Sequence, residues 1–578
     1  MFGTVLEKYI GISKCTGRQL AEISGLSEAA ISRYRSGKQV PKKSSADIES
    51  ICRALAEISK VNGIDGVDFK KVSEEMRSAA GGDNFNYRAF RTRLNLLFSV
   101  LSVNVAKLSK SLNYDSSYIS RIRNGQRKPS KPEKFAAEIA EYTASRFNSD
   151  SEMKTVSQLI GKSASDIKSC SAYAAAITAW LSDESGDELP ENPISKFLRK
   201  LSEFDLNQYI RAIHFDEIKV PSVPFSIPIS KIYYGLENMK KGEIDFLKAT
   251  AFSKSCEPVF MGSDMQMDDM AADMDFSKKY MFGLAVMLKK GLHLNVVHNL
   301  NRPFNELMLG LESWIPLYMT GQISPYYLNG VHNRVFCHFL NVSGAAALAG
   351  ESISGHHKNG RYYLTKNREE LQYYRQRSEF ILKKALPLME IYRKDSAETF
   401  RAFLAADSEK PGNRKNKLSV PPLYTMEPGY LEEFLRKRNI PKGEAEKILR
   451  CAKEKRLMAE NIMLHSRIED EIPVLTQEEF EKYPPSLSVS DIFYENDLLY
   501  SYDDYEEHIK QTENFARKNP NYSFTMTTQN EFRNIRIVIR EGEWAMISKG
   551  NSPAIHFIIR HPILRNAIEN LIFPVTSA

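Results

Sequence analysis

The sequence predicts a multidomain protein: two small all-α domains, then an α/β domain, and finally a small α+β C-terminal module. Three observations support this order. A stretch of 22 residues in the N-terminal quarter occurs a second time in similar form, which indicates a duplicated domain. Helix-like and strand-like segments alternate from about residue 240 to 390, and short strands with a hairpin turn occupy the C-terminal tail. At 578 residues, the chain is also too long for a single hydrophobic core.

The duplicated stretch runs from Leu20 to Pro41 and again from Leu108 to Pro129, offset by 88 residues without a gap. In each copy, the pattern predicts a short amphipathic helix followed by a turn. Gly25 stands at this turn in the first copy and Asn113 in the second, and these residue types adopt the left-handed conformation most easily. The sequence therefore predicts two helices joined by a tight turn, twice.

Capping residues mark where the second helix begins. Ser27 in the first copy and Asp115 in the second have side chains suited to an N-cap. Gly37 and Gly125 then end the helix, and basic residues crowd the loop that follows. The two copies thus share an N-capping residue, a glycine at the end of the helix and a basic loop after it.

The second helix of each copy has an apolar face and a polar face. Ile31 and Tyr34 point inward, as do Ile119 and Ile122 in the second copy, because each pair lies three residues apart. On the outward face, serine and arginine suit base edges, and the basic residues beyond the helix suit phosphates. The residues predicted to contact DNA are Glu28, Ala29, Ser32, Arg33, Arg35, Lys38, Lys42, Lys43, Ser116, Ser117, Ser120, Arg121, Arg123, Arg127 and Lys128.

On these residues, both copies resemble the lambda-repressor/Cro-like helix-turn-helix family. The resemblance implies a compact bundle of about five helices, with the second helix of the motif in the DNA major groove. That family often carries Glu two residues before the terminal Gly, where it ties back to the first helix. Arg35 and Arg123 stand there instead, so we expect these positions to serve phosphates. A small helical domain that binds protein is the alternative.

Charge is distributed unevenly along the chain. Residues 1–150 carry 25 Lys and Arg against 16 Asp and Glu, whereas the remainder carries 54 against 56. The basic excess thus belongs to the duplicated region, where a nucleic-acid footprint is expected. The sequence shows no long apolar run and no export signal, and its six cysteines are isolated. We therefore expect a cytoplasmic protein with no membrane contact, no metal and no cofactor.

Composition and periodicity divide the chain into seven parts. The Gly-containing segment after the first helical domain and the basic segment near residue 410 are both predicted to be linkers. The predicted parts are a first helix-turn-helix domain (1–60), a linker (61–86), a second helix-turn-helix domain (87–149), a helical connector (150–230), an α/β sensor domain (231–395), a linker (396–420), and a helical segment with an α+β module (421–578).

The order of parts in the α/β domain resembles one half of a phospholipase-D superfamily domain. The corresponding parts are a strand ending in Ser263, a strand led by Gly291, the segment His332-Asn333-Arg334, and the turn Gly350-Glu351-Ser352. The chemistry of that family needs a nucleophilic His from each of two copies. Here Arg334 replaces the expected Lys, Phe339 replaces the expected Asp, and no second His-x-Lys motif exists. An unrelated α/β domain is the alternative.

A degenerate motif of this kind suits binding better than hydrolysis, because Arg334 retains its charge. The predicted ligand site comprises Ser263, His332, Arg334 and Ser352, and its ligand would be a small anionic effector. The sequence therefore predicts a bacterial or phage-derived transcriptional regulator that is not an enzyme. Its expected partners are double-stranded DNA, the effector and a second copy through the C-terminal region. The alternatives are a DNA-directed phosphodiesterase of phospholipase-D type using His332, and a phage-defence or toxin-control protein with autoregulatory DNA binding.

Overall fold

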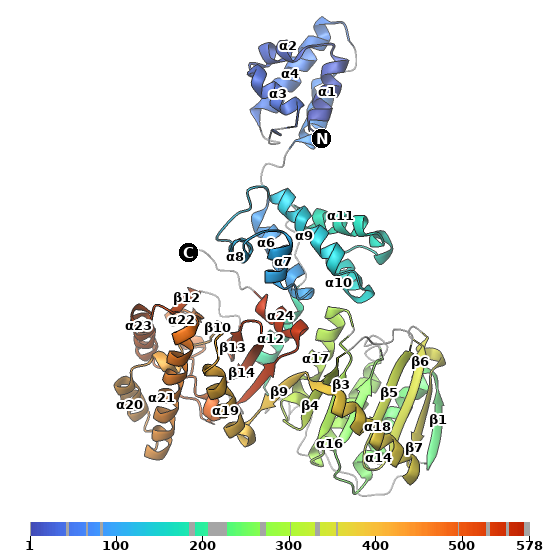
Figure 1. Cartoon of the computed structure of the whole chain (residues 1–578), viewed down its shortest axis with the longest axis vertical. Coiled ribbons are helices and arrows are strands. Elements are labelled where there is room, and N and C mark those ends of the chain that lie inside the picture. Colours follow the sequence, from blue (N-terminus) through green and yellow to red (C-terminus); the bar gives the residue numbers. More distant parts are fainter. Residues whose placement is uncertain are drawn as a thin grey trace. The chain divides into compact units, whose positions relative to one another are not determined.

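The fold is multidomain, with helical domains in the N-terminal part and two mixed sheets in the C-terminal half (Figure 1). A computed structural model of the chain describes residues 2–37, 39–41, 45–64, 67–80, 85–183, 191–205, 228–265, 273–300, 302–329, 336–353, 356–494, 496–527, 532–550 and 554–571. The chain divides into two compact units, of which the first consists mainly of residues 1–90 and the second of most of the remainder.

Five helices form the first helical domain. They are α1 (Phe2–Ile12), α2 (Gly17–Ser24), α3 (Glu28–Arg35), α4 (Ala46–Val61) and α5 (Phe69–Ala79). Helix α5 lies inside the segment predicted to be a linker, and its Val72 and Met76 are fully buried in the core of the domain. The linker prediction for 61–86 is therefore wrong over α5, because the apolar residues of this segment recur at helical spacing and complete the bundle.

The second helical domain contains the second copy of the motif, and its last helix packs on η1 (Ala164–Ile167) and α17 (Phe304–Tyr318) instead of on the bundle. Its helices are α6 (Tyr87–Val100), α7 (Val105–Ser111), α8 (Ser116–Arg123), α9 (Pro132–Arg146) and α10 (Asp150–Ile160). Helix α8 begins and ends 88 residues after α3, so the 88-residue offset between the two sequence copies also separates the two equivalent helices. Three further helical segments follow, namely η1 (Ala164–Ile167), α11 (Cys170–Leu181) and α12 (Pro193–Glu203).

The first sheet has eight strands in the order β1-β7-β6-β5-β2-β3-β4-β8. The strands are β1 (Ser230–Tyr234), β2 (Val259–Ser263), β3 (Leu294–His298), β4 (Ile323–Leu328), β5 (Phe336–Val342), β6 (Ala347–Ile353), β7 (Arg361–Thr365) and β8 (Ala385–Pro387). Strands β2, β3 and β4 are parallel, and the other pairs are antiparallel. The helices of this half are α14 (Gly235–Phe252), α16 (Met274–Lys289), α17 (Phe304–Tyr318) and α18 (Arg368–Lys384).

The second sheet repeats the strand order and directions of the first. Read from its other edge, its order is β9-β15-β14-β13-β10-β11-β12, with β10, β11 and β12 parallel and the other pairs antiparallel. Its strands are β9 (Met389–Tyr392), β10 (Arg414–Lys417), β11 (Ile468–Pro473), β12 (Tyr522–Thr527), β13 (Ile535–Arg540), β14 (Trp544–Lys549) and β15 (Ile555–Ile559). Only β8 has no counterpart among the described strands. The C-terminal half is therefore a tandem duplication of one α/β fold.

The helices of the second half include two that line its interior, α19 and α21. The full set is α19 (Ala397–Ser408), α20 (Pro428–Lys437), α21 (Lys442–His465), α22 (Gln477–Lys482), α23 (Tyr502–Lys518) and α24 (Pro562–Glu569). This half is as large as the first, so the expectation of a small α+β module is corrected to a seven-stranded α/β fold.

A second linker prediction is also wrong. The basic segment 396–420 contains helix α19 and strand β10, which lies in the middle of the second sheet. Its basic side chains are held by carboxylates, since Arg414 donates to Asp407 at 2.6 Å and Lys417 to Glu471 at 2.9 Å. Asp407 lies on the preceding helix α19, and Glu471 is the cross-strand partner of Lys417 on the adjacent strand β11, so the charges of this strand are neutralised within the fold.

Candidate nucleic-acid interface and C-terminal cavities

The predicted turn and caps of the first motif are confirmed. Gly25 has a φ of 72° and ends α2 in the left-handed conformation. The Ser27 hydroxyl accepts a hydrogen bond from the backbone N–H of Ala30 at 3.2 Å, which caps α3. Ile31 and Tyr34 are buried against the bundle. These local interactions fix which face of α3 turns outward.

The outward face of α3 carries the expected side chains. Glu28, Ala29, Ser32 and Arg33 are exposed. The Arg33 Nε donates to the Ala29 carbonyl at 3.1 Å, which lays the guanidinium along the helix surface. The three loop lysines predicted to bind phosphates, Lys38, Lys42 and Lys43, lie outside the described residues.

The second motif is built in the same way. Asn113 has a φ of 57°, and the Asp115 carboxylate accepts the backbone N–H of Ser117 at 2.7 Å. Hydrogen bonds from Ser117 lower the pKa of Asp115 from its ordinary value, so the cap carries a negative charge at the start of α8. Ile119 and Ile122 are buried as predicted.

The outward face of α8 and its following loop form a polar, basic surface. Ser117, Arg121, Arg127 and Lys128 are exposed, and Ser120 is half-buried. The Arg127 guanidinium lies 4.7 Å from the centroid of the Tyr118 ring, a cation–π contact that leaves the charge at the surface. Ser116 begins α8, and its side chain lies outside the described part of the structure.

Two of the predicted phosphate contacts are corrected. Arg35 makes a two-point ion pair with Glu7 of α1, with Nε 2.7 Å from Oε1 and Nη2 3.2 Å from Oε2. The helix-turn-helix family places a carboxylate on the second helix. In this domain the two charges are exchanged: the arginine lies on α3, and the carboxylate of Glu7 lies on α1. Arg35 therefore ties α3 to α1 and is engaged within the domain.

Arg123, the equivalent residue in the second motif, is buried, with only 4% of its surface exposed. Its Nε donates to Asn95 at 2.9 Å, and Asn95 stands 88 residues after Glu7. The remaining guanidinium nitrogens donate to the side chain and the carbonyl of Asn570, at 3.1 and 2.8 Å. Burial lowers the pKa of Arg123 to about 9. A buried side chain cannot reach a phosphate, so the prediction that Arg123 contacts DNA is wrong.

The first sheet contains a cavity of about 270 Å³ at the carboxyl ends of β2 and β3. In open α/β sheets, this is the region where ligands bind. Ser263 lines the cavity, and its hydroxyl accepts the backbone N–H of Met265 at 3.2 Å. Ser352 is buried in β6 and is not among the lining residues. The predicted His332 and Arg334 lie outside the described residues, so the full predicted site is not assembled.

Two buried titratable groups line this cavity that the sequence analysis missed. Burial raises the pKa of Glu243 to about 8, and its Oε2 has no hydrogen-bond partner. Burial lowers the pKa of His298 to about 3, and its Nε2 lies 2.8 Å from the Tyr318 hydroxyl. The sequence did contain a signal, because Glu243 falls four residues after buried Met239 and therefore on the apolar face of α14.

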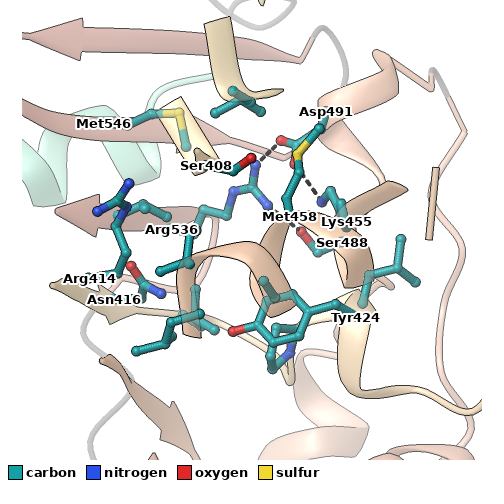
Figure 2. Close-up of a pocket in the computed structure, with 18 of the residues that line it drawn as sticks. Ser408, Arg414, Asn416, Tyr424, Lys455, Met458, Ser488, Asp491, Arg536 and Met546 are labelled. Atoms are coloured by element: carbon teal, nitrogen blue, oxygen red, sulfur yellow. Dashed lines mark hydrogen bonds and ion pairs between the residues drawn. The ribbon is translucent and has the colours of Figure 1, made fainter. Parts of the chain in front are cut away.

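A cavity of about 150 Å³ occupies the same place in the second half (Figure 2). In each half, the lining comes from the first parallel strand (β2 or β10), the strand antiparallel to it (β5 or β13) and the helix that leads into the second parallel strand (α16 or α21). The charges differ, since the cations Arg414, Lys455 and Arg536 line the second cavity with the carboxylates Asp407 and Asp491. The sequence analysis assigned none of these three residues.

The described residues show neither a membrane helix nor a metal centre. None of the described helices combines the length and apolar character needed to cross a membrane. Among the same residues, no group of three His, Cys, Asp or Glu side chains is placed to hold a metal ion.

Comparison with known proteins identifies no family. No protein family matches the chain, and no curated protein matches it at a significant level. Among solved structures, the archaeal chromatin protein TrmBL2 is 10% identical over 44% of this chain and 99% of its own, with a TM-score of 0.22. Polyphosphate kinase from Porphyromonas gingivalis is 11% identical over 59% of this chain and 49% of its own, with a TM-score of 0.19. At TM-scores this low, neither likeness carries an argument about fold or function.

Proposed function

We propose that this chain is a sequence-specific, double-stranded-DNA-binding transcriptional regulator. Its two helix-turn-helix domains would place α3 and α8 in the major groove, and its duplicated α/β region would sense an effector or join two copies. The observation that carries the proposal is the repetition of one exposed surface. Ser32 and Arg33 on α3 recur as Ser120 and Arg121 on α8, and both arginines are exposed.

This repeated surface suits base recognition. A serine hydroxyl can donate or accept, and an arginine can hold guanine through two hydrogen bonds. Both helices are fixed to their own bundles by caps and by two buried apolar residues, so their outward faces are rigid. A rigid, short helix with a basic end is the arrangement that positions side chains in a groove.

The second domain is joined to the C-terminal half by the contacts that bury Arg123. Besides Asn570, the Ser102 hydroxyl donates to the Ile563 carbonyl at 2.7 Å, and Asn570 Nδ2 donates to the Val103 carbonyl at 2.9 Å. An effector that favours one arrangement of the C-terminal half would thereby change the DNA affinity of the second domain, and DNA would change the effector affinity equally.

The test is fluorescence anisotropy of the full chain on labelled duplexes, over a range of salt concentrations. If each domain contacts about three phosphates, log affinity should fall with log salt at a slope of about −5. A double variant, Arg33→Glu with Arg121→Glu, should abolish binding. The charge-matched control is Arg517→Glu with Lys518→Glu, at the exposed end of α23.

Two results would overturn the proposal. One is a lack of duplex binding by the full chain at low salt. The other is an equal loss of affinity in the two double variants, which would show that only net charge matters and that α3 and α8 do not contact DNA.

A further inference from the structure

The cavity of the second half is lined by a charged cluster and by apolar side chains. It lies between β10, β13 and β14 of the sheet and helices α19 and α21. Figure 2 shows Lys455, Asp491 and Arg536 together on the charged side, with Met458 and Met546 also facing the cavity. The sheet and the two helices that form this lining all belong to one α/β fold.

Asp491 is the centre of the charged cluster. Its Oδ2 lies 2.5 Å from Lys455 Nζ, and its Oδ1 is paired with Arg536. Arg536 also donates to the Ser488 hydroxyl at 3.3 Å through Nη1, while its buried Nε has no hydrogen-bond partner among the described residues. His556 lies 3.9 Å from the same carboxylate, but burial and the nearby cations lower its pKa well below the ordinary value. His556 is therefore neutral, and one carboxylate serves two cations.

A second group of the same composition lies beside it. Asp407 accepts hydrogen bonds from Arg414 and Arg540, each at 2.6 Å, and from the Trp544 indole at 2.9 Å. Asp470 already accepts hydrogen bonds from Tyr424, Tyr522 and Asn416. Of the four cations, Arg414, Lys455 and Arg536 line the cavity together with two carboxylates, Asp407 and Asp491, so the described lining residues carry one positive charge in excess.

An unbalanced charge away from water is unfavourable unless a counter-ion accompanies it. The effect is visible at Lys455, where burial and the neighbouring Arg536 lower the pKa to about 7. An anion in the cavity would restore the balance and hold the proton on this lysine. It would also give Arg536 Nε an acceptor, and buried polar groups without partners are rare.

The size and the apolar lining limit what else the ligand can be. A buried apolar cavity of ~150 Å³ is large enough to hold a benzene ring. The apolar part of the lining includes Met458, Ile462, Val538 and Met546. Because the excess is a single positive charge, a monoanion balances it, whereas a phosphate monoester would bring about −1.5 to −2.

We propose that this cavity binds a small organic monocarboxylate with a ring-sized apolar body, its carboxylate lying against Lys455 and Arg536. This inference concerns ligand binding alone and does not depend on DNA binding. It also distinguishes the two halves, since the cavity of the first half is lined by two acidic side chains, Glu243 and Glu306, and one cation, Arg302, and has no excess of positive charge among its described lining residues.

The experiment is isothermal titration calorimetry of the full chain with benzoate as the probe. The titration should extend to on the order of 10 mM, because so small a ligand is expected to bind in the micromolar to millimolar range. Benzamide, which has the ring without the charge, and inorganic phosphate, which has the charge without the ring, should bind at least about tenfold more weakly than benzoate, the loss expected for a missing charged hydrogen bond or a missing apolar body.

Lys455→Met should weaken benzoate binding by about tenfold or more, the loss of one charge-assisted hydrogen bond. Lys453→Met is the matched control, because Lys453 lies on the same helix and is exposed. Met458→Trp leaves every charge in place and fills the cavity, so it should also abolish binding. Circular dichroism confirms that each variant is folded.

Several outcomes would overturn the proposal. Equal binding of benzamide would show that the cavity recognises only apolar bodies, and equal binding of phosphate would show that it is a simple anion site. An absence of benzoate binding, or unchanged binding in Met458→Trp, would show that the four cations and their carboxylates form a structural cluster only.

Discussion

The guanidinium of Arg123 is held by Asn570, 447 residues further along the chain. Its counterpart Arg35 binds Glu7 within its own bundle. The difference originates at one position, because Asn95 replaces Glu7 in the second copy and cannot neutralise the arginine. The same residue thus closes one domain in the first copy and joins two parts of the fold in the second.

Removing the two equivalent arginines should have unequal effects. Arg123→Ala should lower the free energy of unfolding by about 2–3 kcal/mol, because it leaves buried groups of Asn95 and Asn570 without partners. Arg35→Ala should cost no more than about 1 kcal/mol, because its ion pair is partly exposed. Hydrogen exchange of the α6 and α24 amides provides a local measurement. Equal protection losses in the two variants would contradict this account.

The outward arginines should set sequence preference, and the loop lysine should not. Arg33→Ala and Arg121→Ala should each cost about 1–3 kcal/mol at one base position and relax the preference there. Lys128→Ala should weaken binding to all duplexes alike, because a phosphate contact carries no sequence information. Selection from a random duplex library, compared between variants, measures both effects. An unchanged selected motif in the arginine variants would remove them from base recognition.

Stability should depend on pH through Glu243. Burial raises the pKa of this carboxyl to about 8 in the folded protein, from an ordinary value of 4.5. Between these two values, the folded state keeps a proton that the unfolded state has released, so stability falls as pH rises, by at most about 1.4 kcal/mol per pH unit. Above pH 8, the dependence should end.

Glu243→Gln should remove this contribution and make the protein more stable than the parent at pH 8. Denaturant titrations at several pH values measure the difference between the two proteins. Glu379→Gln, an exposed position on α18, is the control and should leave the pH dependence unchanged. If the parent and Glu243→Gln curves run parallel from pH 5 to 8, Glu243 does not retain a proton in the folded state.

Two glycines of α1 should respond in opposite directions to alanine. A Cβ at Gly3 would lie 2.5 Å from the Arg35 carbonyl oxygen, so Gly3→Ala should destabilise the first domain by about 1–3 kcal/mol. A Cβ at Gly11 would meet nothing within 4 Å, so Gly11→Ala should stabilise the helix by up to about 1 kcal/mol. Thermal unfolding of the full chain, followed by exchange of α1 amides, checks the sign of each. A Gly3→Ala variant as stable as the parent would contradict the close packing of α1 on α3, and a destabilised Gly11→Ala would contradict the open space beside Gly11.

Much of the local structure was predictable from the sequence. The apolar pattern and the turn residues at either end predict a helix over 304–318 and a strand over 535–540, and α17 and β13 have these bounds. The caps at Ser27 and Asp115 were predictable for the same reason, since each acts on backbone groups two or three residues away. The cavity at the strand ends followed from the alternation of strands and helices, but Glu243 in its wall did not.

The sequence by itself therefore determined the two helix-turn-helix domains and the outward face of α3 and α8, because caps, turns and helical spacing are short-range interactions. Only the tertiary structure decided that Arg123 is buried, that the basic strand β10 lies in the middle of a sheet, and that the two α/β halves share one topology. The burial of Arg123 and the position of β10 depend on partners far away in the sequence: Asn570 holds Arg123, and β11 and β13 flank β10. A charged side chain is exposed or buried according to whether such a partner can neutralise or hydrogen-bond it, and that partner is brought near only by folding.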